Sequence, residues 1–295
     1  MTISDDPPVE TLRLPLAETL RVAQLVAREA GRILLEGSGT RPTVGFKSED
    51  INLVTEYDKR SEALIVERLA RAFPNDRIVA EEGTTMPGMA ASGPGELQRA
   101  RIWYVDPLDG TTNFAHGLPI FSVSLGLWVD GCAVLGVVEA PALGWTFAGT
   151  TKAGGSPGGS TFNGKPISPS TTDRLGSALL VTGFPYERNP VQNNLAEWTA
   201  FTAAAQGTRR LGSAALDLCF VACGWLDGYW ERALHPWDLV AGAAIVEGAG
   251  GRATELDGSP FIGTTGRVLA SNGHIHDQMI RILQGVARRS NAPWP

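Results

Sequence analysis

The sequence predicts an α/β protein in which two α/β halves, residues 1–160 and 161–295, pack as layers and share a cleft. The first half combines helix-periodic segments with short apolar runs typical of strands, and from residue 178 onward strand-like and helix-like segments alternate. No stretch of disordered composition divides the chain, and 295 residues exceed the usual size of one domain. We place the boundary within residues 150–175.

In the first half, residues 15–35 carry apolar side chains at three- and four-residue spacing up to Gly37, which predicts an amphipathic helix. A second helix is expected over 58–73, and the polar stretch between the two is expected to be a loop or a short hairpin. The runs RIVA and IWYV predict brief strands, separated by a mobile surface loop at 83–95. Residues 122–149 predict an antiparallel meander, since three apolar runs are joined by turn residues.

The second half follows a glycine-rich bend at 154–159. Its expected elements are, in order, a strand at 178–183, helices at 195–205 and 214–223, a strand at 227–231, a helix at 238–249, a strand at 268–272 and a closing helix at 275–288. The helix at 238–249 contains Ala241-Gly242-Ala243-Ala244, small residues that permit close packing of its backbone.

Charge and composition exclude several classes of function. The formal net charge is −6, and the only short basic runs are Arg209-Arg210 and Arg288-Arg289, so we expect no nucleic-acid partner. The first residues lack a basic and apolar leader, and no apolar run approaches the roughly 18 residues needed to span a bilayer. We therefore expect a cytoplasmic protein without a membrane partner.

The three cysteines, Cys132, Cys219 and Cys223, lie in apolar surroundings, and we interpret them as reduced core thiols. Cys219 and Cys223 stand one helical turn apart, but no His or further Cys flanks them at ligand spacing. Packing in the core is therefore favoured over a metal site.

Three carboxylates occur where α/β proteins bind ligands. Glu81 follows the run IVA and Asp106 follows WYV, so both emerge at the C-terminal ends of short strands. Asp109 lies three residues further on, and Pro107-Leu108 holds the backbone in a bend that lets both aspartates face one point. Mg²⁺ is usually held by a few carboxylates plus substrate phosphate, and the Leu108 carbonyl adds another oxygen.

The segment DPLDG taken alone is typical of a surface turn, because Asp, Pro and Gly are common turn formers. The next residues, Gly110-Thr111-Thr112, supply free backbone N–H groups before a possible helix, and such a terminus binds anions. Metal ligands and a phosphate cradle within six residues are more specific together than either is alone. We therefore predict a metal site that hydrolyses a phosphate ester.

Other acids leave two interpretations open. Asp238 opens an apolar helix, either as a remote metal ligand or as an N-cap or first-turn acid. Glu231 ends a strand, where it is either a residue that binds substrate hydroxyls or a solvated acid at the edge of the sheet. At the start of the second helix, stabilisation of the helix dipole explains Glu62, whereas for Asp58 we favour a role in the site. Zinc is not expected, because His235 has no second His at ligand spacing.

The chain resembles the inositol monophosphatase family of magnesium-dependent, lithium-sensitive sugar phosphatases. The resemblance runs over nearly the whole chain and is carried, in order, by FKSEDINLVTEYDKRSE, VAEEG, WYVDPLDGTTNF, SAALDL and HPWDLVAGAAIVEGAGG. It implies a layered αβαβα fold, a homodimer, and hydrolysis of a phosphate monoester with two or three Mg²⁺ ions per subunit, with Mn²⁺ as a possible substitute.

The resemblance also implies the metal ligands. A first Mg²⁺ is expected at Glu81, Asp106 and the carbonyl of Leu108, and a second at Asp106, Asp109 and Asp238. A third, weaker ion is expected to share Glu81 and waters beside Asp106. Two ions about 4 Å apart can clamp the attacking and leaving oxygens of an in-line displacement.

Further roles follow from the same resemblance. Asp58 and the Thr111 hydroxyl look like the family pair that orients and helps deprotonate the attacking water, with Glu82 as an acid beside them. The implied substrate contacts are Gly110 and Thr111 at the phosphate, Asp109, Ala214 and Glu231 at the sugar hydroxyls, and Lys47 near the third ion.

The substrate is less narrowly predicted than the chemistry. The form DPLDGTTNF favours myo-inositol 1-phosphate, hydrolysed to myo-inositol and phosphate. The stretch TGFPYERNP at 182–190 lies where the family varies its sugar-facing residues, so fructose 1,6-bisphosphate, 3'-phosphoadenosine 5'-phosphate and histidinol phosphate stay open. A non-catalytic binding protein on this fold is an alternative of another class, against which the full set of expected ligands argues.

Overall fold

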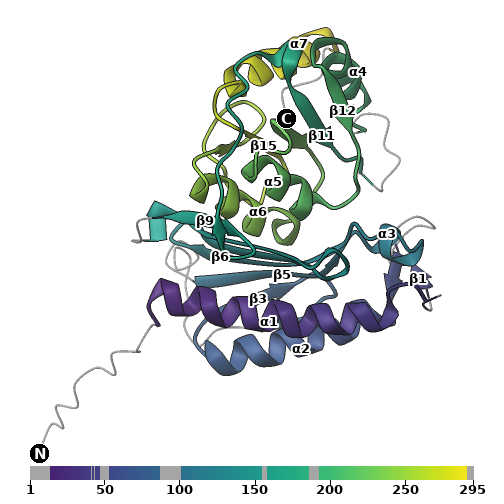
Figure 1. Ribbon diagram of the computed structural model, residues 1–295, viewed down its shortest axis with the longest axis vertical. Helices are drawn as coiled ribbons and strands as arrows, with labels where there is room; N and C mark the ends of the chain where they lie inside the picture. The colour runs from purple at the N-terminus through teal and green to yellow at the C-terminus, as the bar shows by residue number, and fades with distance from the viewer. Residues whose placement is uncertain are drawn as a thin grey trace, which may run out of the picture.

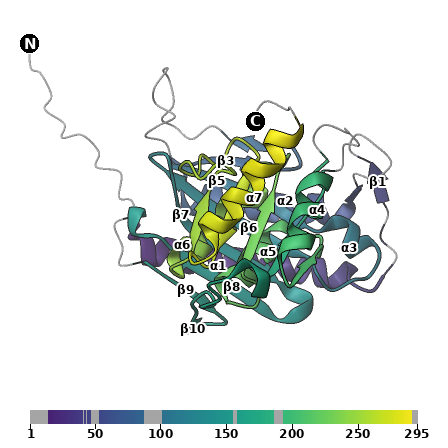
Figure 2. The same cartoon turned by 90° about the horizontal axis from the view of Figure 1, so that it is seen from above.

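The computed structural model describes residues 14–40, 42, 44–46, 53–86, 101–154, 158–185 and 193–290. These residues form five layers, αβαβα, which confirms the predicted fold class (Figure 1). Helices α1 and α2 cover the outer face of a larger sheet, α5 and α6 lie between the sheets, and α4 and α7 lie side by side over a smaller sheet (Figure 2). Within the described residues, no helix combines the length and the apolar character needed to cross a bilayer.

The helices are α1 (Leu16–Gly37), α2 (Glu56–Ala72), α3 (Thr111–Ala115), α4 (Leu195–Ala204), α5 (Ala214–Ala222), α6 (Pro236–Gly248) and α7 (His276–Ser290). The first α-helix is amphipathic, as predicted. It buries Ala23, Ala27, Ala30 and Leu34 at three- and four-residue spacing against the larger sheet.

The larger sheet has the strand order β10-β9-β8-β7-β6-β5-β3-β4 within the described residues. Its strands are β3 (Arg77–Ala80), β4 (Thr85–Met86), β5 (Arg101–Asp109), β6 (Ser122–Val129), β7 (Cys132–Ala140), β8 (Trp145–Thr150), β9 (Gly159–Phe162) and β10 (Lys165–Pro166). Antiparallel pairing from β6 to β8 confirms the meander, and β3 runs parallel to β5. The C-terminal ends of β3 and β5 therefore lie at the same edge of the sheet.

The smaller sheet has the order β12-β11-β13-β15-β14 in the described part of the chain, and a separate hairpin pairs β1 (Val44–Phe46) with β2 (Leu53–Thr55). Its strands are β11 (Leu179–Thr182), β12 (Gly207–Arg209), β13 (Gly228–Glu231), β14 (Arg252–Thr254) and β15 (Val268–Ser271). The larger sheet continues through β10, a few residues past residue 160. The division of the chain into 1–160 and 161–295 stays a prediction.

Helix α6 approaches the larger sheet along a row of glycines. Gly126, Gly136 and Gly149 are cross-strand neighbours on β6, β7 and β8. A Cβ added at Gly136 would lie 2.0 Å from the backbone oxygen of Ala241 on α6, and one added at Gly126 would lie 2.6 Å from its nitrogen. The small residues predicted for close packing thus lie against a row of glycines on the sheet. This contact sets the distance of α6 from the sheet and so the position of its first turn.

Substituting Gly136→Ala should therefore lower the free energy of unfolding by about 1–3 kcal/mol, because the added methyl meets backbone that cannot rotate away. Urea denaturation followed by circular dichroism measures this loss. Gly176→Ala is the matched control, since Gly176 is exposed and its added Cβ would have no neighbour closer than 3.9 Å. Equal stability of the two variants would contradict the close contact.

Some predictions about individual residues need correction. Cys132 is exposed, so it is not a core thiol. It follows the turn at the end of the β6–β7 hairpin, where Asp130 and Gly131 are exposed as well. Cys219 is buried in α5 as predicted, and Cys223 is half-buried. Lys47 lies outside the described residues, as does the part of the predicted 83–95 loop from residue 87 onward.

Candidate active site

The two aspartates of DPLDG lie on a bulged strand rather than in a surface turn. In the pairing of β5 with β6, Asp106 lies opposite Ser124 and Asp109 opposite Ser122, so β5 contains one extra residue between the aspartates. The backbone N–H of Leu108 donates to Asp106 Oδ1 at 2.9 Å. The predicted bend is present, but the strand continues through it to Asp109.

Glu81 and Asp106 meet at the shared edge of β3 and β5. The backbone N–H of Glu81 donates to the Val105 carbonyl at 3.1 Å, which extends the parallel pairing to the acids themselves. Burial raises the pKa of Asp106 well above its usual value, and the charges of Glu81, Asp109 and Asp238 raise it further, as does a hydrogen bond with Glu81. The other predicted carboxylate ligands are therefore close enough for their charges to act on Asp106.

Asp109 reaches across to the N-terminus of α5 in the second half of the chain. Its carboxylate accepts hydrogen bonds from the Ser213 hydroxyl at 2.6 Å and from the backbone N–H groups of Ala215 at 2.9 Å and Ala214 at 3.3 Å. Burial raises the pKa of Asp109 to about 6, and these hydrogen bonds oppose the shift. The contact joins the two halves and brings Ala214, a predicted substrate residue, next to a predicted metal ligand.

Asp238 is the third residue of α6 and caps that helix. The His235 N–H donates to its Oδ2 at 2.7 Å, which confirms the first-turn role. Burial raises the pKa of Asp238 well above the usual range, and the charges of Glu81 and Asp109 add to the shift. A capping role and membership of the acid cluster therefore coexist.

Asp58 and Thr111 form a buried pair. The Thr111 hydroxyl lies 3.1 Å from Asp58 Oδ1 and 2.9 Å from the Leu108 carbonyl oxygen, either of which can accept its proton. The other oxygen of Asp58 accepts hydrogen bonds from the N–H and the hydroxyl of Thr55, at 2.8 and 2.6 Å. Asp58 is fully buried, so its orientation is fixed by α2 and by the Leu108–Thr111 segment.

Glu231 is not a solvated edge acid, because β13 lies inside the smaller sheet between β11 and β15, and the side chain is buried. The Tyr229 hydroxyl donates to Glu231 Oε2 at 2.6 Å, and burial raises the pKa of Glu231 to about 7. A Cβ on Gly183 would lie 2.1 Å from Glu231 Oε1, so this position has no room for a side chain.

Two residues near the predicted site, Tyr229 and Asp217, were not singled out from the sequence, and Glu62 was assigned only to the helix dipole. Tyr229 lies two positions before Glu231 and so on the same side of a strand, a spacing that signals contact. Asp217 on α5 is buried, and burial raises its pKa well above the usual value. The charges of Glu231 and Asp109 raise the pKa further. Glu62 accepts a hydrogen bond from the backbone N–H of Glu82 at 2.7 Å, so its role exceeds stabilisation of the helix dipole.

The donor atoms fit Mg²⁺, because the predicted ligand set consists of carboxylates and one carbonyl, without nitrogen or sulfur. In the part of the chain that the structure describes, no three acidic, His or Cys side chains already surround one ion position. Backbone N–H groups hold an oxygen each of Asp106, Asp109 and Asp238. A cation would supply the positive charge that this cluster lacks.

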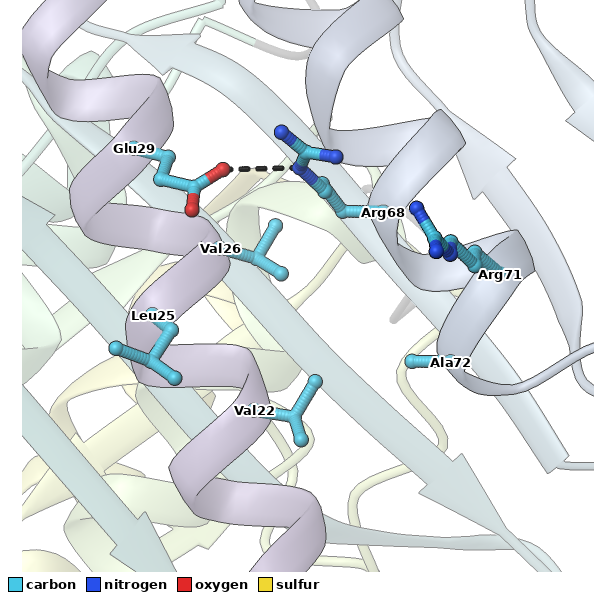
Figure 3. Close-up of a pocket in the computed structure, with 7 residues that line it drawn as sticks. All are labelled: Val22, Leu25, Val26, Glu29, Arg68, Arg71 and Ala72. Carbon is cyan, nitrogen blue, oxygen red and sulfur yellow. Dashed lines mark hydrogen bonds and ion pairs between the residues drawn. The ribbon is translucent and has the colours of Figure 1, made fainter.

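A cavity of about 470 Å³ lies elsewhere, between α1 and α2 (Figure 3). Its lining includes Val22, Val26, Arg71 and the ion pair of Glu29 with Arg68. In this pair Arg68 Nε lies 2.9 Å from Glu29 Oε2. None of the predicted site residues lines it. The acid cluster, not this cavity, is therefore the candidate active site.

The chain is similar to known proteins over most of its length. The family model described as the inositol monophosphatase family matches residues 16–288. An inositol-1-monophosphatase from Synechocystis sp. is 42% identical over 265 residues, which cover 90% of this chain and 88% of the relative.

Solved structures give the same result. An inositol monophosphatase from Anabaena (Nostoc) sp. PCC 7120 is 41% identical with a TM-score of 0.80, over 94% of this chain and 100% of that one. An extragenic suppressor protein suhB from Bartonella henselae is 33% identical with a TM-score of 0.81, over 90% and 98% of the two chains. The chain belongs to the inositol monophosphatase family, a family of phosphoric monoester hydrolases.

Proposed function

We propose that the protein hydrolyses inositol monophosphate, with myo-inositol 1-phosphate as the preferred substrate and Mg²⁺ as the cofactor. The observation that carries this proposal is the meeting of the buried Asp106 and Asp109 with the half-buried Glu81 and Asp238, beside the Asp58–Thr111 pair. Without a cation, repulsion among these carboxylates disfavours their ionised form. The cluster suits phosphoryl transfer, a reaction in which charge neutralisation and positioning dominate. Family membership supports the hydrolysis of a phosphate monoester.

The proposed metal ligands are Glu81, Asp106 and the Leu108 carbonyl for one ion and Asp106, Asp109 and Asp238 for another, with a third, weaker ion near Glu81. When bound, Mg²⁺ or Mn²⁺ neutralises the phosphate oxygens and makes water more acidic. The bulge in β5 serves this arrangement, because it turns Asp106 and Asp109 toward one region while the Leu108 carbonyl lies between them in sequence.

Water activation is assigned to Asp58 and Thr111. With its proton donated to Asp58 Oδ1, the Thr111 hydroxyl keeps a lone pair that accepts a hydrogen bond from water and orients it for attack. Asp58 is then the acceptor of the proton that the water loses. Glu82, in the turn after β3, is proposed as an acid beside this pair.

Substrate binding is assigned to both halves of the chain. Gly110 and Thr111 bind the phosphate through backbone N–H groups, and Asp109, Ala214 and Glu231 contact the polyol hydroxyls. Gly110 adopts a φ of 90°, and a Cβ there would lie 2.9 Å from the Ile120 carbonyl oxygen, so the segment needs glycine. Lys47 is proposed near the third ion.

We also propose a homodimer in the cytoplasm, without nucleic-acid or membrane partners, on the grounds of the family resemblance and the net charge of −6. Sensitivity to Li⁺ is expected for the same site, because a small monovalent cation competes for carboxylate oxygens without supplying the same charge.

A substrate panel with purified protein tests the proposal. Phosphate release is expected to be fastest from myo-inositol 1-phosphate, to require Mg²⁺ and to be inhibited by Li⁺ and by excess Mg²⁺. Faster turnover of fructose 1,6-bisphosphate, 3'-phosphoadenosine 5'-phosphate or histidinol phosphate would keep the chemistry and change the substrate. Absence of turnover on every compound with Mg²⁺ or Mn²⁺ would favour a non-catalytic binding protein.

A further inference from the structure

The first two turns of α2 contact three segments of the first half that carry the proposed site. Asp58 accepts a hydrogen bond from Thr111, and the Ser61 hydroxyl donates to the Pro107 carbonyl inside the β5 bulge at 2.9 Å. Glu62 contacts the turn that follows β3. These three α2 residues are spaced i, i+3 and i+4, so they share one face of the helix.

Both carboxylate oxygens of Glu62 accept hydrogen bonds from a single turn. Its Oε2 accepts the backbone N–H of Glu82 at 2.7 Å, and its Oε1 accepts both the backbone N–H and the hydroxyl of Thr84, at 3.2 and 2.6 Å. The side chain is 3% exposed, a burial that exposed helix-dipole acids do not show. All three hydrogen bonds come from Glu82 and Thr84, which belong to the same 81–84 turn as Glu81.

The backbone of this turn makes three hydrogen bonds: the Ala80 N–H donates to the Thr84 carbonyl at 3.0 Å, the Gly83 N–H to the Ala80 carbonyl at 3.4 Å, and the Glu81 N–H to the Val105 carbonyl at 3.1 Å. The following strand β4 contains two residues in the described part of the chain. Gly83 at its apex adopts a φ of 102° with open space around it. A carboxylate that accepts three hydrogen bonds from such a turn restricts the orientation of the residues on either side.

We propose that Glu62 is a positioning residue for the metal site: it fixes the 81–84 turn so that the Glu81 carboxylate stays directed at Asp106. This inference rests on the proposed function, because it assigns the consequence to Mg²⁺ affinity. Glu62 itself binds neither metal nor substrate. In Glu62→Gln, one carboxamide oxygen remains as an acceptor while the NH₂ group faces N–H or O–H donors, so the turn loses at least one of its anchors.

Calorimetric titration of MgCl₂ into the metal-free protein tests the proposal without measuring activity. The Kd for Mg²⁺ should rise about 10–100-fold in Glu62→Gln, the usual range for residues that orient metal ligands. Glu67→Gln is the matched control, because it is the same change on the same helix at a side chain that is 72% exposed, and its Kd should stay within about twofold of wild type.

Thr84→Val removes one of the three hydrogen bonds and leaves the Glu62 charge, so it should weaken binding less than Glu62→Gln but in the same direction. It also tests the proposal if Glu62→Gln does not fold. A Kd equal to wild type in either folded variant would overturn the positioning role, even if thermal stability fell. If wild type itself takes up no Mg²⁺, the proposed function fails; if wild type binds and the variants bind equally well, only this inference fails.

Discussion

Asp106→Asn should reduce kcat for myo-inositol 1-phosphate by at least about 1,000-fold, equivalent to about 4 kcal/mol of lost transition-state stabilisation. Asp106 is the carboxylate proposed to be shared by two ions, and its pKa is raised by burial and by three neighbouring acids. An amide cannot bridge two cations as a carboxylate does. Initial rates of phosphate release at saturating substrate and Mg²⁺ measure the loss.

The same variant should be at least as stable as wild type when metal is absent. Asn keeps an oxygen that can accept the Leu108 N–H while removing a buried charge beside three other acids. Asp130→Asn is the control, since Asp130 lies exposed at the β6–β7 turn with a φ of 50°, a conformation that Asn tolerates. A folded Asp106→Asn protein whose kcat stays within tenfold of wild type would contradict the metal assignment.

Asp58→Asn should lower kcat by about 100–10,000-fold while leaving Mg²⁺ affinity close to wild type, because Asp58 is assigned to proton transfer rather than to metal binding. The amide oxygen can still accept a hydrogen bond from Thr55 or Thr111, so the start of α2 is expected to keep its geometry. Parallel measurement of kcat and of the calorimetric Kd separates the two roles. A large rise in the Kd with a small change in kcat would assign Asp58 to the metal instead.

Thr111→Val should produce a loss similar to that of Asp58→Asn, and the double variant should be little worse than either single variant. Residues that act as one unit show this strong non-additivity. Simple multiplication of the two losses would mean that Asp58 and Thr111 act separately.

Features set by local sequence were predictable. The end of β3 at Ala80 and the buried start of β5 follow from short apolar runs, and parallel pairing then brings Glu81 next to Asp106. The proline in DPLDG indicated a bend, which the structure shows as a bulge within a longer strand. The short strands β12 and β14 were missed, because segments of three residues have too little periodicity to be recognised.

Features set by long-range packing were not predictable from local pattern. Glu62 sits at a helix start, where an acid has an ordinary explanation, and its contacts lie 20 and 22 residues away on a turn. Cys132 has apolar neighbours in sequence, but it stands next to the exposed turn of the β6–β7 hairpin. The family resemblance supplied the ligand assignments. The contacts of α2 with three segments of the site depend on the fold and could not be predicted from the sequence.

The most direct measurement is the anomalous scattering of Mn²⁺ in crystals of the wild-type protein. We expect peaks bridged by the Asp106 carboxylate, within coordination distance of Glu81 and the Leu108 carbonyl on one side and of Asp109 and Asp238 on the other. Crystals that hold Mn²⁺ only at surface sites, or hold none at millimolar concentration, would contradict the convergence of these acids on a metal.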